Sequence, residues 1–180
     1  MKQKQKQRFH SYCLLLCFIL RAKPQKATRN KKNPRETFFI LEITEAQQRR
    51  QGDVNGEPIA FFSSPIYTDS YEYKFGIRVY LNGVDNVAIF VHMMEGEHDD
   101  LLQWPFTRTI TLSILDRSGA KHNDISQIMQ ATPNVSAFQR PREAICRKGY
   151  GFVKFAPIEQ VFGLHYVKKD KLFLKIEFSD

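Results

Sequence analysis

Short alternating segments are the feature of this sequence that most constrains its fold. From residue 37 onward, apolar and polar side chains alternate with a period of two, and clusters of Gly, Pro, Asp and Asn separate the segments. Such alternation indicates β-strands with one buried face, whereas an amphipathic helix repeats its apolar positions every three or four residues. The sequence therefore predicts an all-β fold, an antiparallel β-sandwich of about seven to eight strands with one or two short helices.

Turn residues set the limits of the predicted strands. Asn82-Gly83 and residues 116–119 and 168–171 carry the polar and glycine residues that favour tight turns. We expect the last two strands, on either side of residues 168–171, to form a hairpin. The predicted strands are residues 37–43, 59–62, 73–81, 87–94, 107–115, 151–155, 165–167 and 172–178. Helices are predicted only for residues 156–162 and 124–131.

Positive charge is concentrated at one end of the chain. The formal net charge is +8, but residues 1–35 hold 11 Lys and Arg and no acid, which leaves 16 basic against 19 acidic residues in the remainder. A nucleic-acid-binding groove needs a basic surface on the folded part, so this charge distribution argues against a nucleic-acid partner for the domain. Only the N-terminal arm has the charge to attract polyanions.

The N-terminal arm, residues 1–36, is predicted to be a basic non-globular extension of a domain that spans residues 37–180. Residues 12–20 are apolar, but a membrane-spanning helix needs about 20 such residues, so no stable membrane insertion is expected. Arg21-Ala22-Lys23 follows without a small-x-small cleavage site. An alternative is that the protein is secreted or membrane-associated and that this segment acts as its targeting signal.

Cysteine usage argues against a disulfide framework. The three cysteines are Cys13, Cys17 and Cys146, an odd number with two in the arm, which favours a reducing, cytoplasmic compartment. His10 and the two arm cysteines supply three zinc ligands, whereas structural zinc needs four. We therefore predict no metal and no cofactor.

Two segments of the domain are candidates for a binding surface. Alternation places Ile77, Val79 and Leu81 in the core, so Arg78 and Tyr80 face outward together. A cation and a phenol on one face of a sheet suit a peptide that adds as an extra strand and presents a carboxylate or an aromatic ring.

The second segment is residues 148–153, Lys-Gly-Tyr-Gly-Phe-Val. Alternation places Tyr150 and Phe152 on one side, and Gly149 and Gly151 leave the backbone open to close approach. Two readings stay open from the residues alone. The two rings either face a partner or point into the core, since a buried strand can be apolar on both faces.

A family resemblance rests on residues 90–99, Phe-Val-His-Met-Met-Glu-Gly-Glu-His-Asp, and residues 102–106, Leu-Gln-Trp-Pro-Phe. This stretch resembles the TRAF-type MATH domain, the C-terminal domain of tumour necrosis factor receptor-associated factors, where a strand precedes Gly-Glu-(aromatic or His)-Asp, a Leu and Trp-Pro-Phe. Residues 64–68, 73–83 and 168–171 also resemble that family. The resemblance covers roughly residues 37–180. Residues 128–131, 137–141 and 148–153 are most similar to the sixth vertebrate type, the Toll and interleukin receptor adaptor.

The resemblance implies a peptide-binding site for Pro-x-Glu-x-x-aromatic or acidic motifs. Arg78 would contact the last aromatic or acidic residue, beside Tyr150 and Phe152. Met129 and Phe138 would line a proline pocket, and the backbone amides of Ser136 and Ala137 would hold the glutamate. The implied site comprises Arg78, Tyr80, Met129, Ser136, Ala137, Phe138, Lys148, Gly149, Tyr150 and Phe152. Two features depart from the family pattern: only Ser136 remains of a three-serine stretch, and the aromatic pair is Tyr then Phe rather than Phe then Tyr.

The resemblance also implies an adaptor rather than an enzyme. Its partners would be linear motifs in receptor tails or adaptor proteins of TNF, Toll or interleukin receptor signalling. Residues 1–36 hold no RING, zinc finger or coiled coil, so we expect no ubiquitin ligase activity here, and a TRAF trimer would need a coiled coil that these residues lack. A MATH module that presents substrates for ubiquitination is an alternative. Trp104, Pro105 and Phe106 are predicted to be structural, and His98, Asp99 and Asp100 to be surface residues without a catalytic role.

Overall fold

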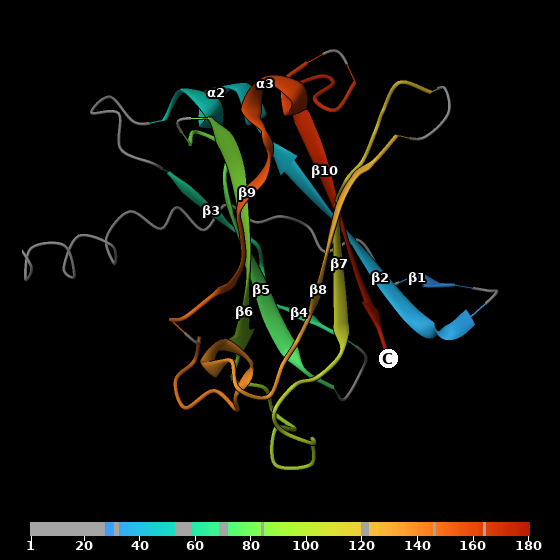
Figure 1. Ribbon diagram of the computed structural model, residues 1–180, viewed down its shortest axis with the longest axis vertical. Coiled ribbons are helices and arrows are strands. Elements are labelled where there is room, and N and C mark those ends of the chain that lie inside the picture. The colour runs from blue at the N-terminus through green and yellow to red at the C-terminus, as the bar shows by residue number, and fades with distance from the viewer. Residues whose placement is uncertain are drawn as a thin grey trace, which may run out of the picture.

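The fold is a sandwich of two antiparallel β-sheets (Figure 1). The computed structural model describes residues 28–30, 33–52, 59–68, 72–83, 85–119, 123–145, 147–163 and 165–180. The first sheet has the order β1 (Thr28–Asn30), β2 (Asn33–Thr44), β10 (Lys171–Ser179), β7 (Thr109–Ile114), β8 (Ile125–Gln130). The second has the order β3 (Ala60–Phe62), β5 (Lys74–Tyr80), β6 (Asn86–Met94), β9 (Tyr150–Pro157), and β4 (Ile66–Tyr67) also pairs with β5. The predicted all-β sandwich is confirmed.

The core lies between the inward faces of the two sheets, as the alternation predicts. In β10 the even-numbered residues from Leu172 to Phe178 are buried, and the odd-numbered ones are partly exposed. An aromatic cluster joins the sheets at the centre. The Phe75 ring of the second sheet lies 4.7 Å from Phe178 and 5.9 Å from Phe39, both of the first sheet. Edge-to-face rings of this kind contribute about 0.5–1.5 kcal/mol per pair beyond their burial.

Two short helices lie together at one end of the sandwich (Figure 1). They are α2 (Ala46–Gln51) and α3 (Ile158–Val161). Arg50 of α2 connects them, because its guanidinium pairs with Glu159 at 2.5 Å and lies 4.9 Å from the centre of the Phe162 ring. The one-turn helix η2 (Ser136–Phe138) lies at the opposite end, where the Phe106 amide donates to the Phe138 carbonyl at 2.9 Å.

The loop of residues 95–106, which we call the Trp-Pro-Phe loop, is held by Asp99. The Asp99 carboxylate accepts a hydrogen bond from the Gly96 amide at 3.1 Å, and its backbone carbonyl accepts one from the Trp104 indole at 3.0 Å. The prediction that Asp99 is a surface residue is therefore wrong, since only 3% of it is exposed. The Trp104 ring packs against Tyr73 at 5.0 Å and Phe106 is buried. Burial raises the pKa of the Tyr73 hydroxyl, which donates to the Gln103 carbonyl.

Two predicted elements are wrong. The helix predicted at residues 124–131 is replaced by the edge strand β8 over Ile125–Gln130, and residues 165–167 form no strand. The final strand consequently pairs with β2 and β7 instead of closing a hairpin. The turn itself is present, because Lys168 and Lys171 exchange two backbone hydrogen bonds of 3.1 Å around Lys169 and Asp170, which have φ angles of 53° and 58°.

The remaining differences concern boundaries. The helix predicted at residues 156–162 is confirmed only over Ile158–Val161, and α2 was not predicted. β2 begins at Asn33, before the proposed domain start at residue 37. Cys146 and the apolar run 12–20 with its two cysteines lie outside the described residues. In the described part of the chain, no helix has the length and apolar character needed to cross a membrane.

Candidate functional site

The edge strand β9 is the centre of the candidate site. It pairs with β6 and leaves its other side free of any described strand. Its register places Tyr150 opposite Val91, Gly151 opposite Phe90 and Phe152 opposite Ile89. Such an edge offers backbone N–H and C=O groups to an incoming extended segment.

Two glycines let β9 lie close to β6. A Cβ atom on Gly151 would lie 2.1 Å from the Ile89 carbonyl oxygen and 2.7 Å from the Phe90 Cα. A Cβ on Gly149 would lie 2.3 Å from the His92 imidazole. Close packing inside the sheet is thus the reason for both glycines, in addition to any access they give a partner.

Tyr150 and Phe152 share the inner side of β9, because their cross-strand neighbours Val91 and Ile89 are core residues. They lie at the margin of the sandwich. Tyr150 is 40% exposed and its ring stands 5.2 Å from that of Phe138, which is fully buried. Phe152 is partly buried against Phe155, with ring centres 5.9 Å apart. The Tyr150 ring is therefore accessible to a partner, while the Phe138 ring against which it lies is buried.

On the outer face of the second sheet, aromatic rings surround Arg78. Its guanidinium carbon lies 5.0 Å from the Phe90 ring centre, 5.5 Å from that of Tyr80 and 5.8 Å from that of Phe62. We call these four residues the arginine cluster. The Arg78 Nε atom is buried and makes no hydrogen bond. Cation–π contacts thus hold the guanidinium among the three rings, and its buried Nε donor is left without a partner.

The arginine cluster and the Tyr150–Phe152 pair lie on opposite faces of the second sheet and meet at the pairing of Phe90 with Gly151. Phe62 and Phe90 were not predicted as site residues. Alternation in β6 carried the signal for Phe90, because Ile89 and Val91 are core residues and Phe90 must then point outward.

The other predicted residues lie around the same margin. Met129 of β8 and Phe138 of η2 are buried in the core cluster, at 6% and 0% exposure. Gln127 of β8 reaches β9, where its amide donates to the Phe155 carbonyl at 3.4 Å. Ser136 and Ala137 form the start of η2, and the first amides of such a turn have no carbonyl partner within it.

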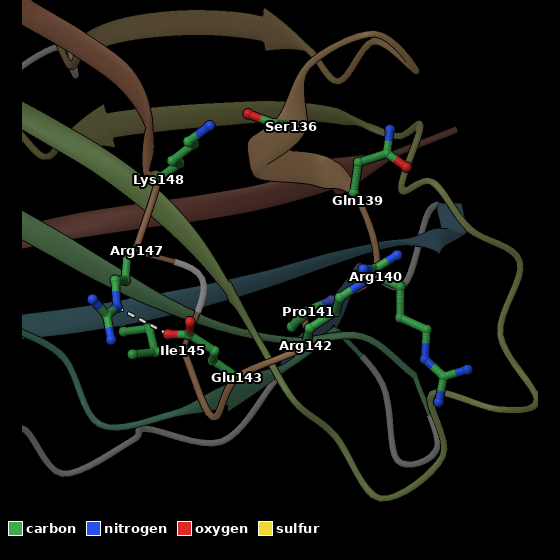
Figure 2. A pocket seen from close by; sticks show the side chains of 9 residues that line it. All are labelled: Ser136, Gln139, Arg140, Pro141, Arg142, Glu143, Ile145, Arg147 and Lys148. Atoms are coloured by element: carbon green, nitrogen blue, oxygen red, sulfur yellow. Dashed lines mark hydrogen bonds and ion pairs between the residues drawn. The ribbon is translucent and has the colours of Figure 1, made fainter.

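A pocket of about 1010 Å³ adjoins this margin between η2 and β9 (Figure 2). Ser136 and Lys148, both exposed, contribute to its lining. The remaining lining residues belong to the loop that leads from η2 to β9. Among the described residues, no three His, Cys, Asp or Glu side chains are grouped so that they could hold a metal ion.

Comparison with known proteins identifies the family. The family model for the TRAF/meprin MATH domain matches residues 58–175. The chain belongs to the TRAF/meprin MATH domain family. A solved structure of TRAF5 from Notothenia coriiceps superposes on this MATH domain with a TM-score of 0.73 at 32% identity, covering 79% of this chain and 73% of that one.

Curated relatives lie in the TRAF branch of the MATH family. TNF receptor-associated factor 6 of Xenopus tropicalis is 35% identical over 145 residues, and TNF receptor-associated factor 5 of Mus musculus is 36% identical over the same length. Each alignment covers 77% of this chain and 26% of the relative. The chain thus spans about a quarter of the length of these relatives. The predicted resemblance to the TRAF-type MATH domain is confirmed, and the match to the sixth type agrees with the similarity predicted from residues 128–131, 137–141 and 148–153.

Proposed function

We propose that this MATH domain is an adaptor module that docks short Pro-x-Glu-x-x-aromatic or acidic segments from receptor tails or signalling adaptors in the cytoplasm. It carries out no reaction itself. The free edge of β9 beside the arginine cluster is the observation that carries the proposal. The names of the relatives agree with it, since both are receptor-associated factors.

In the proposed complex the peptide extends the second sheet by pairing with β9. Main-chain hydrogen bonds to an edge strand give affinity, and side-chain pockets give specificity. The peptide proline packs on the exposed Tyr150 ring, which lies against the buried Phe138. Met129 is the further residue that we assign to this proline pocket. The peptide glutamate lies at the amides of Ser136 and Ala137.

The last motif residue must reach Arg78 across two intervening strands, β9 and β6. Arg78 lies on β5, so a peptide paired with the free edge of β9 would lie about 14 Å from β5 at the usual strand spacing. Gly151 has no side chain to obstruct this path, and Phe90 forms the surface over which the residue passes. An aromatic ring at the last motif position stacks on the Arg78 guanidinium, whereas a carboxylate at that position accepts hydrogen bonds from the guanidinium N–H groups.

Calorimetric titration of the full chain with a Pro-x-Glu-x-x-Phe peptide tests the proposal. We expect micromolar to sub-millimolar affinity. Arg78→Ala and Phe152→Ala should each weaken binding by about tenfold or more, because few residues dominate such interfaces.

Arg117→Ala is the matched control. Arg117 also stacks on an aromatic ring, with its guanidinium carbon 4.7 Å from the centre of Phe173, but that ring belongs to the first sheet. Its loss should leave peptide affinity unchanged. Circular dichroism should establish that each variant is folded. The absence of binding by folded wild-type protein would refute the proposed site and leave the family assignment intact.

A further inference from the structure

The pocket between η2 and β9 concentrates the positive charge of the folded domain, and we call it the basic pocket (Figure 2). Its lining includes four cations and one carboxylate: Arg140, Arg142, Arg147, Lys148 and Glu143. Beyond residue 35 the chain holds only 16 Lys and Arg against 19 Asp and Glu. Four of those 16 cations therefore line one pocket of a domain that is otherwise acidic.

The local ion pairs leave this charge available. Arg147 pairs with Glu143 at 2.9 Å (Figure 2), and Arg140 pairs with Asp100 at 2.6 Å. All four side chains are exposed, and exposed ion pairs are weak enough to exchange for a better ligand. Within the described part of the chain, Arg142 is in no ion pair. The pocket therefore attracts anions.

The position of the basic pocket links it to the proposed peptide site. Ser136, whose amide holds the motif glutamate in the proposed complex, lines the pocket, and Lys148 stands two residues before the start of β9. The pocket lies beyond the start of β9, at one end of its free edge. The peptide segment that flanks the docked motif on that side would therefore enter the pocket. Its volume of about 1010 Å³ accommodates several side chains.

We propose that the basic pocket binds a run of Asp or Glu residues that flanks the docking motif on one side. This inference rests on the proposed function and adds a specificity determinant to it. The guanidinium group of an arginine binds a carboxylate by donating two parallel N–H hydrogen bonds to it, and three of the four cations are arginines. Acidic flanks would accordingly select among segments that share the same motif.

Three peptides test the inference by calorimetry with the full chain. One carries the motif with neutral flanks, the second has Glu-Glu-Glu before the motif, and the third has Glu-Glu-Glu after it. One of the two acidic peptides should bind about fivefold more tightly than the neutral peptide at low salt, and the gain should fall toward unity at about 0.5 M salt. The other acidic peptide should show no gain, because the pocket lies at one end of the edge.

Substitutions that remove positive charge then test whether the gain in peptide affinity comes from the basic pocket. In the double variant Arg142→Gln, Arg147→Gln, the gain should disappear while the neutral peptide binds as in the wild type. Lys169→Asn is the matched control, since it removes an exposed charge at a turn where asparagine tolerates the positive φ of 53°. It should preserve the gain.

The outcomes separate the two proposals. If the neutral peptide binds but acidic flanks add nothing, or if the gain survives in the double variant, the basic pocket is not the site. Equal gains for both acidic peptides would indicate attraction to the basic N-terminal arm and would overturn the inference as well. If none of the three peptides binds, the proposed function and the inference both fail.

Discussion

Asp99 stabilises the Trp-Pro-Phe loop from inside the fold. It is one of few buried charged side chains among the described residues, and it joins the start of the loop at Gly96 to Trp104 through its carboxylate and its carbonyl. The motif that identifies the family therefore has a structural role, with Tyr73 and Phe106 packing around it. Its diagnostic value comes from loop geometry rather than from contact with a partner.

Asp99→Ala should lower the free energy of unfolding by about 1–3 kcal/mol, because the Gly96 amide loses its acceptor within a buried loop. Urea unfolding measures the change. Asp100→Ala is the neighbouring control. Its exposed pair with Arg140 should contribute no more than about 1 kcal/mol. Equal effects of the two substitutions would contradict the structural role of Asp99.

For single residues, the sequence predicted which face of the sheet a side chain occupies better than it predicted the neighbours of that side chain. Alternation correctly placed Arg78 and Tyr80 on the outer face, because Ile77, Val79 and Leu81 are buried. It did not show that Phe62 and Phe90 complete the ring of aromatic contacts, since these come from two other strands. Cross-strand neighbours depend on register, which no local pattern contains.

Strand β9 joins the edge of the second sheet through a close approach that only glycine permits. Any side chain at Gly151 would collide with the backbone of β6, which cannot move as a flexible side chain would. The pairing of Gly151 with Phe90 is also the point where the arginine cluster and the Tyr150 side of the strand meet. Sheet geometry and the proposed peptide site thus depend on the same residue.

Gly151→Ala should destabilise the domain by about 1–3 kcal/mol, as overpacked positions do, and should weaken peptide binding by displacing the β9 edge. Val153→Ala on the same strand is the control. Val153 is 69% exposed, and its truncation should change stability by less than about 0.5 kcal/mol. Denaturant unfolding and peptide titration of both variants check this. A Gly151→Ala protein as stable as wild type would show that β9 lies farther from β6.

Sequence reasoning missed β8 and α2 for two different physical reasons. Ile125, Ile128 and Met129 are spaced as on a helix face, yet in β8 the first and third point inward while Ile128 is 67% exposed. Pairing with β7 decided the outcome, which is a tertiary effect. The sequence of α2 has no apolar stripe, since the residues that the helix buries are only Ala46 and Arg49. Neither feature is visible in apolar periodicity.

The molecule as a whole depends on contacts between the two sheets, because neither sheet buries its apolar face alone. The aromatic cluster around Phe75 supplies such contacts at the centre, with Phe39 and Phe178 from the first sheet and Phe106 from the Trp-Pro-Phe loop packed on Phe178. One cluster therefore couples both sheets and the loop. We expect them to unfold as a single cooperative unit.

Phe75→Ala should cost about 3–5 kcal/mol, since the side chain is fully buried and its removal leaves a cavity between the sheets. Phe173→Ala, on the outer face of the first sheet and only partly buried, should cost clearly less. Trp104 is the sole tryptophan of the sequence, so its fluorescence reports the loop, while far-UV circular dichroism reports the strands. In urea the two signals should follow one transition in the wild type and in both variants, shifted to lower urea most strongly by Phe75→Ala. A fluorescence transition that precedes the dichroism transition would mean that the loop unfolds independently, and the aromatic cluster would then hold the sheets together without coupling them to the loop.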